Sequence, residues 1–251
     1  MNEIYKIKTG KNPLFLEIKV KVDKPCPLII KGYDGDKIYT TYFEKGHFSN
    51  KEKQGVLSYF FELPLTPENL FVSCLNKKTG TSDGIKLVMA KEYPLRVERV
   101  YSASSQRVNN FVNFWIPFCE KAGYLPTGDY SIPEKGIKVQ YSNAIRSVKD
   151  GSVLKTPARV FRSTGQMEFC KPDFCKMTIP MRVMVGLHEA GHYFLDTANE
   201  IECDKFAYKI YRGMGFSKNE AMNSLAKVFE HHEIGKEAEH RMKLMNNYIN
   251  G

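Results

Sequence analysis

The spacing of hydrophobic residues changes near Pro94, and this change divides the chain into two parts. Before Pro94, apolar and polar residues alternate, as they do at 16–22, which is the period of a strand with one buried face. After it, apolar residues recur at helical spacing, first at Val108, Phe111, Val112, Trp115 and Phe118. The sequence therefore predicts an α+β fold with two domains, residues 1–95 and 96–251.

The first domain is expected to be a small antiparallel β-sandwich. Strands are predicted at residues 14–22, 37–43, 55–62, 70–74 and 85–93. Turn-forming segments at 33–36, 78–80 and 82–84 separate them, and no helix intervenes. His47 stands alone and no catalytic group of residues is apparent, so we interpret this domain as a binding or docking module.

The second domain combines strands with helices. A strand is predicted at 137–141, and a hairpin at 159–162 and 166–169 around a turn that contains Gly165. Helices are predicted at 106–122, around 183–194, at 199–211, from Ser217 and at 237–248. Glu220, three residues after Ser217, completes the pattern of a capping box at the start of the fourth of these helices.

Charge and hydropathy narrow the class of protein. The net charge is +9, but the lysines are dispersed without a run of five basic residues, so a nucleic-acid partner is not expected. No apolar stretch approaches the ~20 residues that cross a bilayer, and the first residues lack the apolar segment of a signal peptide. We expect a cytoplasmic protein, or a component of a virion assembled in a cytoplasm, without membrane contact.

The six cysteines are scattered, and we interpret them as reduced thiols. Cys170 and Cys175 are separated by four residues, which is loose for a zinc knuckle, and no second such pair exists.

Residues 187–192 contain the pattern H-E-x-x-H on a predicted helix. His188 and His192, four residues apart, lie on one helix face, so both imidazoles can bind one Zn²⁺ at ~2.0–2.1 Å. Zinc lowers the pKa of a water molecule that it binds to about 7, and Glu189 can then take the proton as general base and return it as general acid.

A second pattern, E-x-x-x-D, follows at Glu200 and Asp204. The two patterns, with Gly191, Phe206 and Ala207, resemble the gluzincin group of zinc metallopeptidases, and in particular short zincins of bacteria and phages. The resemblance covers about residues 158–251, and Cys203 stands where the usual residue is alanine. It implies a zincin-like metallopeptidase domain, with Glu200 as the third zinc ligand and Asp204 holding the ring nitrogen of His188.

Asp196 is the rival third ligand, because an unbroken helix would place it near the face of His192. Aspartate is also common in turns, so Asp196 could instead be a turn residue without a role in metal binding. With only seven residues between His192 and Glu200, the first helix is expected to end near Leu195 and to turn through 196–199, which brings Glu200 to the first turn of the next helix. Glu202 should point elsewhere. Ala198 cannot be a ligand, which excludes the metzincin pattern.

Two further features are implied by the resemblance. An edge strand ahead of the active helix pairs with extended peptides in such enzymes, and residues 166–170 are the best candidate. A downstream histidine can act as an oxyanion donor, but His231, His232 and His240 are each more typical of surface or packing positions.

The leading hypothesis is a zinc-dependent metalloendopeptidase that acts on peptide or protein substrates. The alternative is a structural subunit of a large homo-oligomeric assembly, of the phage head–tail connector or ring type, in which the zinc site is vestigial. That alternative rests on the first domain, which offers no chemistry and whose strands leave sheet edges to be covered. We expect a homo-oligomer or larger assembly formed through the N-terminal domain, and the alternative is a monomeric peptidase in which this domain positions the substrate.

Overall fold

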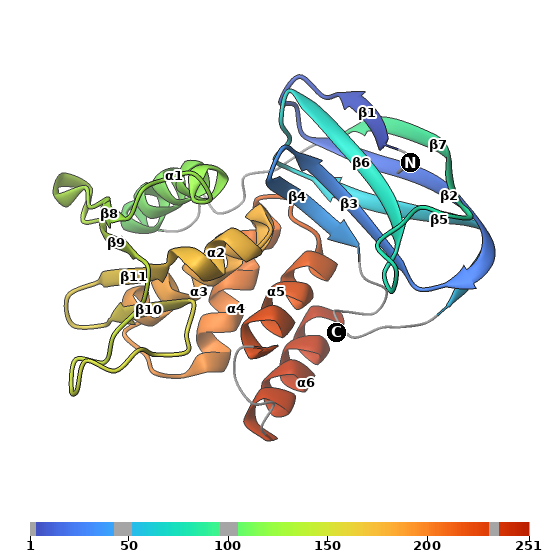
Figure 1. Cartoon of the computed structure of the whole chain (residues 1–251). Helices are drawn as coiled ribbons and strands as arrows, with labels where there is room; N and C mark the ends of the chain where they lie inside the picture. Colours follow the sequence, from blue (N-terminus) through green and yellow to red (C-terminus); the bar gives the residue numbers. More distant parts are fainter. Residues whose placement is uncertain (1–3, 43–51, 96–104, 231–235, 251) are drawn as a thin grey trace.

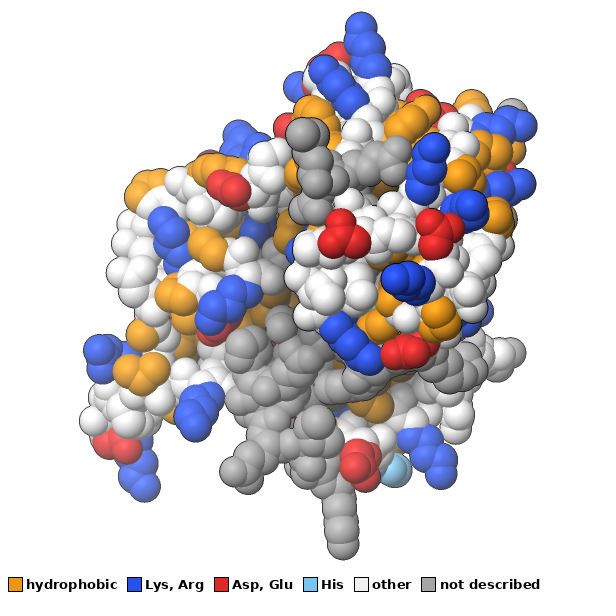
Figure 2. Space-filling model, turned by 45° about the vertical axis from the view of Figure 1, so that its right-hand side comes forward, with side chains coloured by type: hydrophobic (Ala, Val, Ile, Leu, Met, Phe, Trp, Pro, Cys, Tyr) orange, Lys and Arg blue, Asp and Glu red, His pale blue; other side chains and the backbone are white. Residues whose placement is uncertain are grey.

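The structure is a computed structural model that describes residues 4–42, 52–95, 105–230 and 236–250 (Figure 1). Strands form the first part of the chain, and helices with a small sheet form the second. The predicted α+β class is therefore confirmed. The surface carries lysine and arginine side chains scattered among hydrophobic and polar ones, as the net charge of +9 requires (Figure 2).

Seven strands of the first part form two antiparallel sheets, with the orders β1-β6-β3-β4 and β5-β2-β7. Their bounds are β1 (Ile4–Lys8), β2 (Leu14–Cys26), β3 (Leu28–Asp34), β4 (Lys37–Tyr42), β5 (Lys53–Leu63), β6 (Asn69–Asn76) and β7 (Ile85–Pro94). Every second residue of β2 from Leu14 to Val22 is buried. Both sheets contribute to one hydrophobic core, Ile18 from one and Ile30 from the other.

Two of these strands, β1 and β3, were not predicted. Three consecutive apolar residues begin β3, so the alternation that identifies a strand is missing there. At Gly32, a Cβ would lie 2.9 Å from the Thr40 side chain, so this residue allows β3 and β4 to approach closely.

The second part begins with α1 (Gln106–Lys121), as predicted, and continues with a four-stranded mixed sheet. Its elements are β8 (Gly128–Asp129), the short 3₁₀ turn η2 (Pro133–Lys135), β9 (Lys138–Ser142), β10 (Ala158–Phe161) and β11 (Gln166–Cys170). The helices that follow are α2 (Lys171–Lys176), α3 (Ile179–Phe194), α4 (Glu200–Gly213), α5 (Lys218–Glu230) and α6 (Lys236–Asn250).

The sheet order β10-β11-β9-β8 corrects one prediction. Residues 166–170 form β11, which is an inner strand paired with β10 on one side and with β9 on the other. The edge strands of this sheet are β10 and β8, and β10 is the one that contacts α3. The predicted hairpin was right, but sequence pattern does not reveal that β9 pairs in parallel with β11 and takes the other side of it.

Helix α3 lies at the centre of the second part, with buried residues from Ile179 to Leu187. It packs on α1 through Gly186, where a Cβ would lie 2.0 Å from the Trp115 ring. The indole Nε1 of Trp115 donates to the Val183 carbonyl at 3.2 Å. This close contact fixes α3 against the fully buried tryptophan.

The strands and helices meet where α5 and α3 adjoin β4. The hydroxyl of Thr40 donates to the carboxyl of Glu220 at 2.6 Å, and the N–H of Thr41 donates to the same oxygen at 3.1 Å. Ser217 does cap the backbone N–H of Glu220 at 3.1 Å, so only half of the predicted capping box forms.

The predicted domain boundary at residue 95 adjoins residues 96–104, which lie outside the described part. None of the described helices is both long and apolar enough to cross a bilayer.

Candidate metal centre

Helix α3 carries both histidines of the H-E-x-x-H pattern. It begins after Thr178, whose side chain accepts from the N–H of Met181, and Pro180 occupies the first turn, where its missing N–H has no cost. His188 and His192 follow near its C-terminal end, one turn apart on a single face.

The turn after α3 is a Schellman motif, and Asp196 is its left-handed residue with φ 48°. The N–H of Thr197 donates to the His192 carbonyl at 3.2 Å, and that of Asp196 to the Tyr193 carbonyl at 3.4 Å. The helix therefore ends where the sequence predicted. Asp196 is exposed and terminates the helix, and it does not belong to the metal-binding group.

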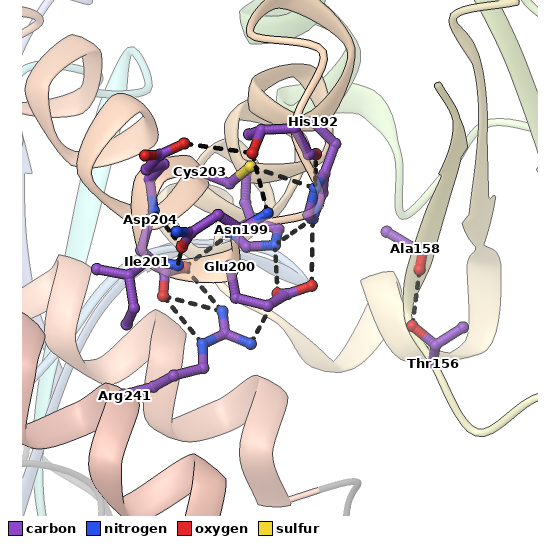
Figure 3. A network of polar contacts seen from close by, with 12 residues as sticks. Thr156, Ala158, His192, Asn199, Glu200, Ile201, Cys203, Asp204 and Arg241 are labelled. Carbon is purple, nitrogen blue, oxygen red and sulfur yellow. Dashed lines mark hydrogen bonds and ion pairs between the residues drawn. The ribbon is translucent and has the colours of Figure 1, made fainter. Parts of the chain in front are cut away.

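Helix α4 starts immediately after this turn. Asn199 caps it by accepting from the N–H groups of Ile201 and Glu202. Glu200 is thereby the first residue of α4, and its side chain is directed at the histidines of α3 (Figure 3).

Nε2 of His188, Nε2 of His192 and the carboxylate of Glu200 form a close triangle. The two nitrogens are 3.1 Å apart, Oε2 of Glu200 lies 3.2 Å from His188, and Oε1 of Glu200 lies 3.4 Å from His192. Ligands bound tetrahedrally at 2.0–2.1 Å are separated by about 3.3 Å, so the three distances fit one ion between them. This partly buried group can hold a metal ion.

The second ring nitrogen of each histidine also has a partner. Nδ1 of His188 lies 2.8 Å from Oδ1 of Asp204, which is fully buried. Nδ1 of His192 lies 2.9 Å from the Thr197 carbonyl, which the turn presents to it. In the neutral rings, the Asp204 carboxylate and the Thr197 carbonyl favour the tautomer that is protonated at Nδ1. The Nε2 lone pairs of both histidines are then available to bind an ion.

Arg241 of α6 joins Glu200 to Asp204, and sequence reasoning missed it (Figure 3). Its guanidinium lies 2.8 Å from Oε2 of Glu200 and donates to both carboxylate oxygens of Asp204 at 2.9–3.1 Å. Glu200 and Asp204 lie on one face of α4, so a basic side chain is expected near them. The sequence does not show which of the later helices supplies it.

These contacts shift the pKa values of the ligands in the metal-free protein. Burial alone would lower the pKa of His188, but hydrogen bonds with Asp204 and Glu200 outweigh it and raise the pKa to about 10. Burial would raise the pKa of Glu200, but the hydrogen bond with His188 and the charge of Arg241 lower it to about 2. Without metal, the site therefore holds its proton on His188.

Glu189 lies among the same groups, because His188, His192 and Glu200 all act electrostatically on it. Burial raises the pKa of its carboxyl above the usual range, while the two histidines and a hydrogen bond from the Val160 backbone oppose that rise. Val160 belongs to β10, so the edge strand borders the glutamate.

Cys203 is fully buried beside His192, with Sγ 3.2 Å from Nδ1. Burial, reinforced by the Glu200 and Asp204 charges, raises the pKa of its thiol to about 12. The thiol therefore stays protonated and packs against the imidazole instead of binding metal.

Among the described residues, none of the other candidates belongs to this group. Glu202 accepts from the Thr197 hydroxyl at 3.2 Å, so it points away as predicted. His240 is exposed on α6, whereas His47, His231 and His232 lie outside the described residues. Cys170 and Cys175 contact the backbone carbonyls of Asn143 and Gly123.

Comparison of the chain with protein-family models, curated proteins and solved structures gives no significant match.

Proposed function

We propose that the chain is a zinc-dependent peptidase whose zinc ligands are His188, His192 and Glu200. The observation that carries this proposal is the convergence of two imidazole nitrogens and one carboxylate, with Nε2 of His188 3.1 Å from Nε2 of His192 and each nitrogen 3.2–3.4 Å from one oxygen of Glu200. Two imidazoles and one carboxylate are the donor set of a catalytic zinc site, because they leave the fourth tetrahedral position open. When bound, zinc supplies Lewis-acid activation of a water molecule and of the substrate carbonyl.

Glu189 is the general base in this proposal. Its pKa is raised by burial, which brings its basicity closer to neutral pH, where a catalytic base is most effective. It accepts the proton of the attacking water and passes it to the leaving amine. Asp204 and Arg241 act as positioning residues, since one orients the His188 ring and the other holds Glu200 and Asp204 in place.

The substrate is proposed to add to β10, which takes over the role that the sequence assigned to residues 166–170. Its open edge can pair with an extended peptide, and the contact between Val160 and Glu189 would bring that peptide next to the base. A peptide docked there is bound mainly by backbone hydrogen bonds, so selectivity for substrate sequence would be modest.

The decisive experiment combines metal analysis with activity. Purified protein should contain one zinc per chain and cleave an unfolded protein such as casein. Glu189→Gln should keep the zinc and lose at least a hundredfold in cleavage rate, because general-base catalysis contributes roughly 10²–10⁴-fold. The matched control is Glu202→Gln on the neighbouring helix, which should retain both. A Glu189→Gln protein as active as the wild type would exclude Glu189 as the base.

A further inference from the structure

One face of the sheet β5-β2-β7 points away from the core. On β2, Leu16, Ile18 and Val20 are buried, so the residues between them face outward, and the strand register places residues of β5 and β7 beside them. We call this set the lysine–aromatic face: Phe15, Glu17, Lys19 and Lys21 of β2, Val56, Ser58, Phe60 and Glu62 of β5, and Lys86, Met89, Lys91 and Tyr93 of β7.

Aromatic rings gather at one end of this face. The rings of Phe15 and Phe60 stack with centroids 5.8 Å apart, and Tyr93 lies 6.2 Å from Phe15 on the other side. Phe60 is 57% exposed and Tyr93 37%. Large aromatic rings that remain in solvent on a sheet face are typical of a surface with a partner.

The charges of the face are predominantly positive. Its two carboxylates are already engaged, since Tyr93 donates to Glu17 at 3.2 Å and Arg212 pairs with Glu62 at 2.8 Å. The face also carries four lysines: Lys19, Lys86, Lys21, which lies 3.4 Å from Asp23 at the strand end, and Lys91, whose Nζ lies 4.9 Å from the centre of the Tyr93 ring. A second copy docked face to face would present the same lysines and be repelled, whereas an anionic partner complements them.

A cavity of about 230 Å³ borders the aromatic end. Phe15 and Phe60 line it together with Arg212, Ser217 and Asn219 and with the carboxylates of Glu62 and Glu220. A flat group next to the Phe15 and Phe60 rings could enter this cavity, where it would meet the polar side chains of Ser217 and Asn219.

We propose that the lysine–aromatic face binds single-stranded nucleic acid. Bases stack on the exposed rings, and the lysines contact the phosphates, the combination by which proteins bind single strands without sequence preference. The sequence predicted against a nucleic-acid partner because it contains no basic run. The strand period of two and the register gather lysines that are dispersed along the chain. This site is independent of the metal centre.

The test is fluorescence anisotropy of a labelled 12-nucleotide oligothymidine with the full chain. If four lysines contact phosphates, affinity should fall roughly 50-fold between 50 and 200 mM salt, because the slope for single strands is about −0.7 per contact. A duplex of equal length should bind more weakly, since its bases cannot stack on the rings. Lys19→Glu and Lys86→Glu should each weaken binding at least tenfold, and Phe60→Ala roughly five- to hundredfold.

The matched control is Lys149→Glu, which makes the same charge change in an exposed loop of the other part of the chain. All substituted side chains are at the surface, so thermal unfolding should confirm that each variant is folded. An equal loss of affinity in Lys149→Glu and Lys19→Glu would show that only the net charge of the chain matters, and it would overturn the proposal. So would unchanged binding by Phe60→Ala, or binding to phosphatidylserine vesicles in preference to the oligonucleotide.

Discussion

Oδ1 of Asp204 lies 2.8 Å from Nδ1 of His188, and the same carboxylate accepts hydrogen bonds from Arg241. The buried aspartate therefore both orients the imidazole and stabilises its protonated form when no metal is present. With metal, that proton must leave, because only the neutral ring can bind the ion.

Zinc binding should release at least one proton per chain at pH 7–8, one from His188 and a further fraction from zinc-bound water, whose pKa is about 7. The pKa of His188 is about 10 in the metal-free protein, so the ring is protonated below that pH and the ion has to displace the proton. From this residue alone, the apparent zinc affinity should fall about tenfold for each pH unit below 10. Titration calorimetry in buffers of different ionisation enthalpy measures the proton count. A count of zero would show that His188 is already neutral.

The third ligand should be distinguishable by substitution. Glu200→Ala removes a donor atom and should weaken zinc binding far more than Asp196→Gly, which keeps the left-handed turn and touches none of the donor atoms. Competition with a chromogenic chelator gives both affinities. The reverse order would transfer the ligand role to Asp196.

Arg241→Met should weaken zinc binding on the order of 10–100-fold, as the loss of a contact behind a ligand typically does. The substitution leaves Glu200 and the buried Asp204 without their guanidinium partner. Arg241→Lys should have an intermediate zinc affinity, because lysine keeps the positive charge but cannot donate to two carboxylates at once in the planar geometry of a guanidinium. Arg146→Met, at an exposed arginine elsewhere, is the control and should bind zinc like the wild type.

Glu220→Gln should stabilise the protein at pH 8 and have little effect at pH 5. Burial raises the pKa of the Glu220 carboxyl to about 7 in the folded protein, and the hydrogen bonds from Thr40 and Thr41 only partly oppose the rise. The folded state thus prefers the proton, and wild-type stability is lost as pH rises through 7, by roughly 3 kcal/mol in total. Glutamine keeps both hydrogen bonds without a charge.

Urea unfolding of both proteins at the two pH values measures this difference. Glu239→Gln, exposed on α6, is the control for the change in net charge. The same gain at pH 5 and pH 8 would contradict the assignment of the pH dependence to Glu220.

Gly186→Ala should destabilise the fold by about 1–3 kcal/mol or more. A Cβ at this position would lie 2.0 Å from the Trp115 ring, so α1 and α3 must separate, and the gain in helix propensity cannot offset this. Gly128→Ala is the control, because its Cβ would meet nothing closer than 4.0 Å. Chemical denaturation should show a clear loss for the first and almost none for the second.

The sequence predicted helix ends and short-range contacts well, and it predicted contacts between residues far apart in the chain poorly. The ends of α3 and α4 and the convergence of His188, His192 and Glu200 depend on the helical period, caps and one short turn, all of which are encoded nearby. The edge position of β10 and the arrival of Arg241 depend on long-range pairing, which a single sequence does not reveal. The lysine–aromatic face was missed because residues distant in sequence become neighbours only through strand register.

The Schellman turn also has a consequence for the order of folding. It confines all three donor atoms to one helical hairpin, so closing the site requires little chain entropy. Arg241 comes from the last helix and is synthesised well after Glu200. An ion bound there would therefore cross-link the end of α3 to the start of α4 without needing α6, whereas Arg241 reaches the site only once α6 is packed against α4.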